Sequence, residues 1–102
     1  MNYVNCTPHA IVLNDGRVFQ PSNTVARVNV EFTEVVDDVC VQDYGKVENL
    51  PAPQDGVRYI VSALVLSALG GSRPDVVAPA TGHPECVRND KGHIVSVPCF
   101  VR

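Results

Sequence analysis

The sequence predicts an α+β fold built mainly from antiparallel strands, as a small distorted barrel or sheet, with one short buried helix near residues 62–69. Short β-branched segments alternate with turn signals at near-regular spacing along the 102 residues. The longest apolar run, 59–69, begins with β-branched and aromatic residues and continues with Ala and Leu, which form helices more readily. No internal repeat or linker interrupts the chain, so residues 1–102 are expected to form a single domain.

The helix is expected to begin after Ser62, whose hydroxyl can accept a backbone N–H, and to end at Gly70, which tolerates the left-handed conformation. A helix of about two turns does not persist without packing. Apolar residues occupy nearly every side of the helix, so we expect other segments to pack against it from both sides.

Because a domain of this size has little surplus stability, we predict a homodimer or higher symmetric oligomer, with ligand pockets at or near the subunit junctions.

The N-terminal segments predict one strand followed by a hairpin. Residues 3–6 form the first strand, which Pro8 ends because proline has no N–H and keeps its neighbour extended. Segments 10–13 and 17–20 flank an Asp-Gly turn at 15–16, which predicts a tight hairpin.

Further strands are predicted along the rest of the chain. In strand 25–32 the two-residue alternation places Arg27 on the opposite face from Val28. Two shorter strands are expected at 39–41 and 45–47, and a Pro/Gly-rich connector at 50–56 leads to the central run. The last predictions, in chain order, are a hairpin of segments 86–88 and 93–97 and a terminal strand over 99–102.

Charge and composition exclude several classes of function. The chain carries 8 Lys and Arg against 11 Asp and Glu, a net charge of −3, which provides no basic surface for duplex nucleic acid. The apolar run is shorter than the roughly 20 residues that a membrane helix needs, and the N-terminus does not resemble a secretion signal. We expect a soluble cytoplasmic protein without a membrane partner. Its four widely spaced cysteines are expected to remain reduced.

Five motifs together resemble a family of small phage and prophage proteins that open with an Asn-Leu-Thr-Pro-His elbow. This chain carries Cys6 where Leu is usual, and additional His and Cys residues near its C-terminus. The resemblance implies a phage accessory protein that acts in the host cytoplasm. Small phage proteins of this type include some that disarm bacterial defence by binding or cleaving nucleotide immune signals. The motifs are Val4-Asn5-x-Thr7-Pro8-His9, Thr24–Val28, Tyr59–Val65, Arg73–Pro79 and Phe100-Val101-Arg102.

The elbow contains the first candidate site residues. Asn5, Thr7 and His9 occupy alternate positions, so an extended segment would present all three on one side. A histidine beside a hydroxyl can donate a hydrogen bond to a phosphate or exchange a proton with it. The alternative is a purely structural elbow in which His9 caps backbone groups.

A second group of candidates lies near the central run. The rigid Arg73-Pro74-Asp75 turn presents a guanidinium suited to phosphate and a carboxylate suited to a ribose hydroxyl, although Arg73 and Asp75 could equally pair with each other. Arg27 needs an anionic partner or an edge position from which it reaches solvent. Tyr59 could stack on a base or lie in the core. Ser62 completes the candidate ligand-binding residues.

Metal and cofactor chemistry receive little support from the sequence. His83, Cys86, His93 and Cys99 are zinc-ligand types, but their spacing is not that of a paired zinc knuckle. No phosphate-binding glycine loop, nucleophile elbow or His-Glu-x-x-His motif is present. We therefore predict no cofactor and no metal.

Three functional hypotheses follow. The first is a phage anti-defence protein that binds and sequesters a small nucleotide-derived immune signal, such as a cyclic dinucleotide or an ADP-ribose derivative. The second is a metal-independent phosphodiesterase in which His9 is the general acid or base, Thr7 positions a phosphate oxygen and Arg73 neutralises developing charge. The third is a protein-binding inhibitor of a host factor that adds a strand to a host sheet.

Overall fold

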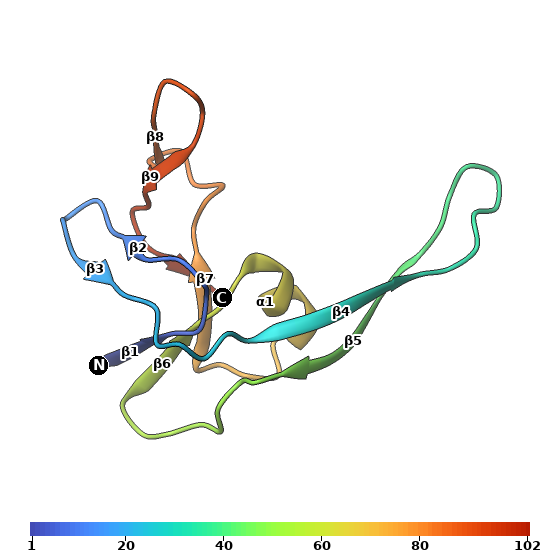
Figure 1. Cartoon of the computed structure of the whole chain (residues 1–102), viewed down its shortest axis with the longest axis horizontal. Coiled ribbons are helices and arrows are strands. Elements are labelled where there is room, and N and C mark those ends of the chain that lie inside the picture. Colours follow the sequence, from blue (N-terminus) through green and yellow to red (C-terminus); the bar gives the residue numbers. More distant parts are fainter.

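The computed structural model describes all 102 residues, and its central element is a four-stranded mixed sheet (Figure 1). Each outer strand pairs with a strand that is distant from it in the sequence. The first three strands of the sheet, in spatial order, are parallel to one another. The last strand is antiparallel to its neighbour. In spatial order the strands are β1 (Asn2–Asn5), β6 (Val57–Ile60), β7 (Val76–Pro79) and β10 (Phe100–Val101).

The apolar run forms the strand and helix that the sequence predicts, and both helix caps are confirmed. Helix α1 (Ala63–Leu69) lies between the parallel strands β6 and β7, so the three form a β-α-β unit. The Ser62 hydroxyl accepts the N–H of Val65 at 3.3 Å. Gly70 ends the helix with a φ of 58°, the left-handed conformation that glycine adopts without strain.

Three two-stranded hairpins surround the sheet, and no barrel closes. The α+β fold and its antiparallel majority are confirmed, since four of the six strand pairings are antiparallel. The parallel pairs are confined to the centre. In chain order the hairpins are β2 (Ile11–Val12) with β3 (Val18–Phe19), β4 (Arg27–Phe32) with β5 (Gln42–Glu48), and β8 (Val87–Arg88) with β9 (Ile94–Ser96).

Of the two short strands predicted here, the one at 39–41 is not formed, and the one at 45–47 is part of a longer strand. A single strand, β5, runs over 42–48, and the chain reverses before it at Asp37 and Asp38. Both aspartates have positive φ, 50° and 65°, as a tight hairpin turn requires. Asp tolerates this conformation better than most residues.

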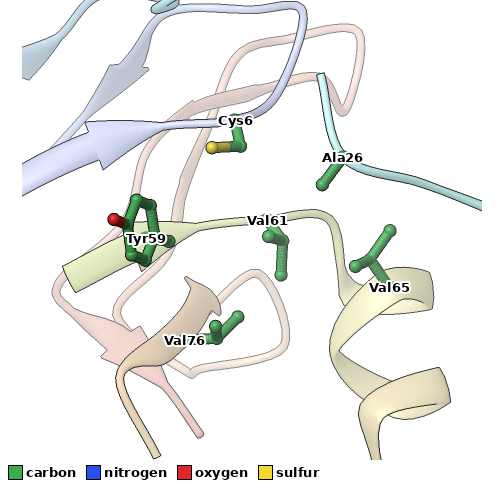
Figure 2. Packing of buried hydrophobic residues seen from close by; sticks show 6 residues of the cluster. All are labelled: Cys6, Ala26, Tyr59, Val61, Val65 and Val76. Atoms are coloured by element: carbon green, nitrogen blue, oxygen red, sulfur yellow. The ribbon is translucent and has the colours of Figure 1, made fainter. Parts of the chain in front are cut away.

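The main core cluster joins the sheet, the helix and the segment before β4 (Figure 2). Val61 and Tyr59 are almost completely buried because they lie on the central part of the β-α-β unit, which is covered on both faces. Cys6 occupies a small apolar slot beside them and is 1% exposed. The cluster consists of Cys6, Ala26, Tyr59, Val61, Val65 and Val76.

The helix is less buried than the sequence predicts. It lies between β7 and the β4–β5 hairpin, yet Val65 is its only buried residue, and Leu64 is 41% exposed. One chain therefore covers only part of the apolar helix surface, because the short strands around it leave one side open. The predicted oligomer remains a prediction.

The seven-residue α1 is the only helix in the structure, and it is too short to span a membrane.

Replacing Ser62 with Ala should lower the free energy of unfolding by about 1 kcal/mol, because an N–H in the first turn loses its acceptor. Denaturant unfolding followed by circular dichroism measures this loss. Ser67→Ala is the matched control, since Ser67 is exposed on the same helix, and it should be neutral or slightly stabilising. Equal losses in both variants would contradict the capping role.

Candidate functional site

The elbow after β1 is held by the side chains of Asn5 and Thr7. The Asn5 amide donates to the carbonyls of His9 and Phe19 at 2.8 and 2.9 Å. Its Oδ1 accepts the Thr7 N–H at 2.9 Å and the Thr7 hydroxyl at 2.7 Å. Both residues are buried, and their polar atoms are occupied within the chain. They shape the elbow, and the capping that the sequence assigned to His9 is performed by Asn5 and Thr7.

The His9 side chain is free to meet a ligand. The residue is exposed, and its imidazole makes no hydrogen bond or ion pair within the chain. It borders a cavity of about 400 Å³ whose other walls are largely apolar. These walls come from segments at both ends of the sequence and include Ile11, Ser62, Pro79, Thr81, Ile94 and Val97.

Arg27 lies on the other side of the elbow. It is exposed at the start of β4 and forms no hydrogen bond or ion pair, so its guanidinium has its full donor capacity available. It borders a cavity of about 320 Å³ formed by the elbow, the start of β4 and the start of α1. A smaller polar hollow beside Arg27 is lined by Asn23, Thr24 and Asn49.

The His9 and Arg27 cavities adjoin, since Thr7 and Ser62 line both. We call this continuous surface the elbow groove, with an arginine lobe at Arg27 and an apolar lobe at His9. Four of the eight candidate residues predicted from the sequence line it: Thr7, His9, Arg27 and Ser62. Asn5 lies beneath the elbow and keeps Thr7 in place.

The remaining candidates form a separate structural cluster. Arg73 makes a two-bond ion pair with Asp75, at 2.9 and 2.8 Å, and also donates to the Pro51 carbonyl at 2.9 Å. Hydrogen bonding to Arg73 lowers the pKa of Asp75, and the same pairing raises the pKa of Arg73. Of the two readings offered by the sequence, the local ion pair is the one observed.

Tyr59 belongs to the same cluster, and its ring lies in the core. Its hydroxyl donates to the Ala52 carbonyl at 3.0 Å, and the Arg73 guanidinium lies 5.9 Å from its ring centroid. With only 2% exposure, the ring has no face open for base stacking. Tyr59, Arg73 and Asp75 therefore tie the proline-rich connector to the sheet, away from the elbow groove.

The apolar walls of the elbow groove were not predicted from the sequence. Val97 reaches the groove because it exchanges backbone hydrogen bonds with the segment after β2: its N–H donates to Val12 at 3.0 Å and its carbonyl accepts from Asn14 at 2.9 Å. These partners are separated by more than 80 positions. The hairpin pattern of 86–97 predicted a local pair of strands but carried no signal for their position against β2.

The predicted zinc-ligand types do not assemble into a site, since no group of three or more His, Cys, Asp or Glu side chains is placed to hold a metal ion. His83 accepts the Glu85 N–H at 3.0 Å within a local turn. All four cysteines are free thiols.

Burial raises the pKa of the Cys6 thiol, and a hydrogen bond with Ser22 partly offsets this rise. Cys6, which lines the groove, therefore stays protonated and unreactive.

No family model matches the chain, and no curated protein or solved structure matches it.

Asp75→Asn should lower the free energy of unfolding at neutral pH by about 1 to 2 kcal/mol. This loss lies between those expected for an exposed and for a fully buried ion pair. The folded-state pKa of Asp75 lies below its ordinary value, so the ion pair stabilises the fold above the unfolded-state pKa of about 4 and is lost as the pH falls through the folded-state pKa. Wild-type and variant unfolding curves, measured from pH 7 to pH 2, should converge in acid.

Asp15→Asn is the control, because Asp15 also pairs with an arginine two residues away but both side chains are more than half exposed. Its pKa is lowered, chiefly by the Arg17 backbone N–H. Solvent screening should make its effect on stability smaller than that of Asp75→Asn. A larger effect at Asp15 would contradict the role assigned to the Arg73–Asp75 pair.

Proposed function

We propose that the chain binds a small anionic, nucleotide-derived ligand in the elbow groove and thereby sequesters an immune signal. One observation supports this most directly: the unpaired guanidinium of Arg27 lies at one end of a groove whose other end is apolar and carries the free imidazole of His9. A phosphate and a base require these two environments. The ligand classes that fit are cyclic dinucleotides and ADP-ribose derivatives.

The arginine lobe has the chemistry of a phosphate subsite. A guanidinium presents five N–H donors in a planar fork that matches two phosphate oxygens. Most other arginine side chains already hold an internal partner: Arg17 and Arg73 pair with carboxylates, Arg58 donates to Tyr3, and Arg88 donates to two backbone carbonyls. Arg27 keeps its donors for an external anion.

The apolar lobe suits a base and its ribose. Its walls offer aliphatic contact from Ile11, Pro79 and Ile94, while His9 and Thr81 supply polar groups at the border. Each lobe has a volume of more than 300 Å³, which is within the range of small-molecule pockets. A ligand that spans the two lobes would pass over Thr7 and Ser62.

The bonds beneath the groove fix its shape before a ligand arrives. Asn5 and Thr7 hold the elbow, and Ser62 is fixed by the helix cap. A preformed groove costs less conformational entropy on binding than a flexible one. The resemblance to small phage proteins supports a role in disarming a host signal.

Arg27→Ala should weaken binding by about 10- to 100-fold, the loss expected for hydrogen bonds to a charged group. Calorimetry with cyclic dinucleotides and ADP-ribose derivatives measures the affinity. Lys91→Ala removes the same charge from an exposed turn outside the groove and should leave the affinity unchanged. Absence of binding to all these ligands at high micromolar concentration would contradict the proposal.

A phosphodiesterase that cleaves the same signals is the second candidate, favoured by the unbonded His9 imidazole at the groove. Arg73 is committed to Asp75 and Pro51, so Arg27 would have to stabilise the charge in its place. Chromatography after incubation separates the two functions. Under the sequestration proposal, heating the complex releases intact ligand. New products that disappear in a His9→Ala variant with retained binding would favour cleavage.

A further inference from the structure

The β4–β5 hairpin extends beyond the body of the protein as an arm (Figure 1). We define the arm as residues 31–44, all of which are exposed. The radius of gyration of the chain is 15.2 Å, against about 13 Å expected for a compact domain of this length. An isolated two-stranded hairpin is only marginally stable in water, so an arm without cover is expected to have a partner.

One face of the arm continues the apolar surface of the core. Val28 and Val47 are opposite each other at its base and pack against the core cluster. Farther out along the same face lie Val30, opposite Tyr44, and then Phe32, which is 65% exposed. Beyond Phe32, the outer part of the arm carries four more valines on its two faces, Val35, Val36, Val39 and Val41, which are 58 to 70% exposed. Strands with this alternation normally bury one face.

The arm is also strongly acidic. Residues 31–44 contain five Asp and Glu and no Lys or Arg, whereas the rest of the chain has eight basic and six acidic residues. Glu31 and Asp43 are directly opposite each other, a destabilising arrangement for like charges. A positively charged apolar partner would relieve both the exposed surface and the repulsion.

Such a surface exists on the same protein, across one face of the central sheet. A groove of about 410 Å³ is lined by three arginines, and its walls include aromatic and aliphatic residues. Arg17 is paired with the exposed Asp15 and Arg58 donates to Tyr3, whereas Arg102 has no partner within the chain. We call it the arginine groove and define it by Arg17, Arg58, Arg102, Tyr3, Leu13 and Phe100. Tyr3, Phe19 and Phe100 pack together beside it, with ring centroids 5.0 to 5.6 Å apart.

The arm cannot reach the arginine groove of its own chain, since it points away from β1 and β3 in Figure 1. We propose that the arm of one copy docks in the arginine groove of a second copy. The valines and Phe32 cover the apolar wall, and the arm carboxylates face arginines. The contact is head-to-tail, because the two surfaces are different parts of the molecule. In a closed assembly, each copy inserts its arm into the groove of one neighbour and accepts the arm of another copy in its own groove.

Light scattering tests the docking with two variants that affect opposite sides of the contact. Phe32→Ser with Val36→Ser disables the arm and leaves the groove intact. Arg58→Glu with Arg102→Glu disables the groove and leaves the arm intact. Wild type should have at least about twice the 11.0 kDa mass of one chain, and each variant alone should have the mass of one chain. An equimolar mixture of the two variants should regain association through the one intact pair of surfaces.

Matched controls separate docking from general surface changes. Val87→Ser with Val95→Ser alters two exposed valines on the β8–β9 hairpin, and Lys91→Glu reverses a charge there; both should retain the wild-type mass. Circular dichroism confirms that every variant is folded. A monomeric wild type at high micromolar concentration, wild-type mass in either disabled variant, or a mixture that stays monomeric would overturn the proposal.

Discussion

The buried side chain of Asn5 determines where the chain leaves the central sheet, and the two surfaces described above depend on that turn. Its amide group donates to the backbone carbonyls of His9 and Phe19. The backbone carbonyl of Asn5 accepts both the N–H and the hydroxyl of Ser22. The next carbonyl, that of Cys6, accepts from Ala26, directly before β4. Asn5 thus holds the elbow, and the Cys6 carbonyl next to it holds the residue before β4. A buried amide is costly unless all its bonds are satisfied, and here they are.

Local sequence signals predicted much of the secondary structure. The Asp-Gly turn, the hairpin at 86–97 and both caps of α1 follow from the conformational preferences of a few residues, and the structure contains each of them. The parallel pairing of β1 with β6 was not predictable in this way. It joins Asn2 to Val57, and no local preference encodes so distant a partner.

The candidate site was predictable in residue type but only partly in position. Thr7, His9, Arg27 and Ser62 meet at one groove, whereas Arg73 and Asp75 bind each other. The short separation of an arginine and an aspartate across a proline favours local pairing, and the extra bond to Pro51 strengthens it. Arg27 has Glu48 as its cross-strand neighbour but forms no ion pair with it, which the sequence pattern could not show.

The hydrogen bonds between Val97 and the segment at 12–14 have a consequence for the order in which the molecule forms. The apolar lobe of the elbow groove combines Ile11 with Ile94 and Val97, so its two walls come from opposite ends of the chain. During synthesis the elbow emerges early, but the lobe stays open until the C-terminal hairpin leaves the ribosome. Contacts of such long sequence separation also form late in folding, because closing the intervening loop costs entropy. The β-α-β unit can assemble first, and the apolar lobe closes only when the β8–β9 hairpin packs beside β2.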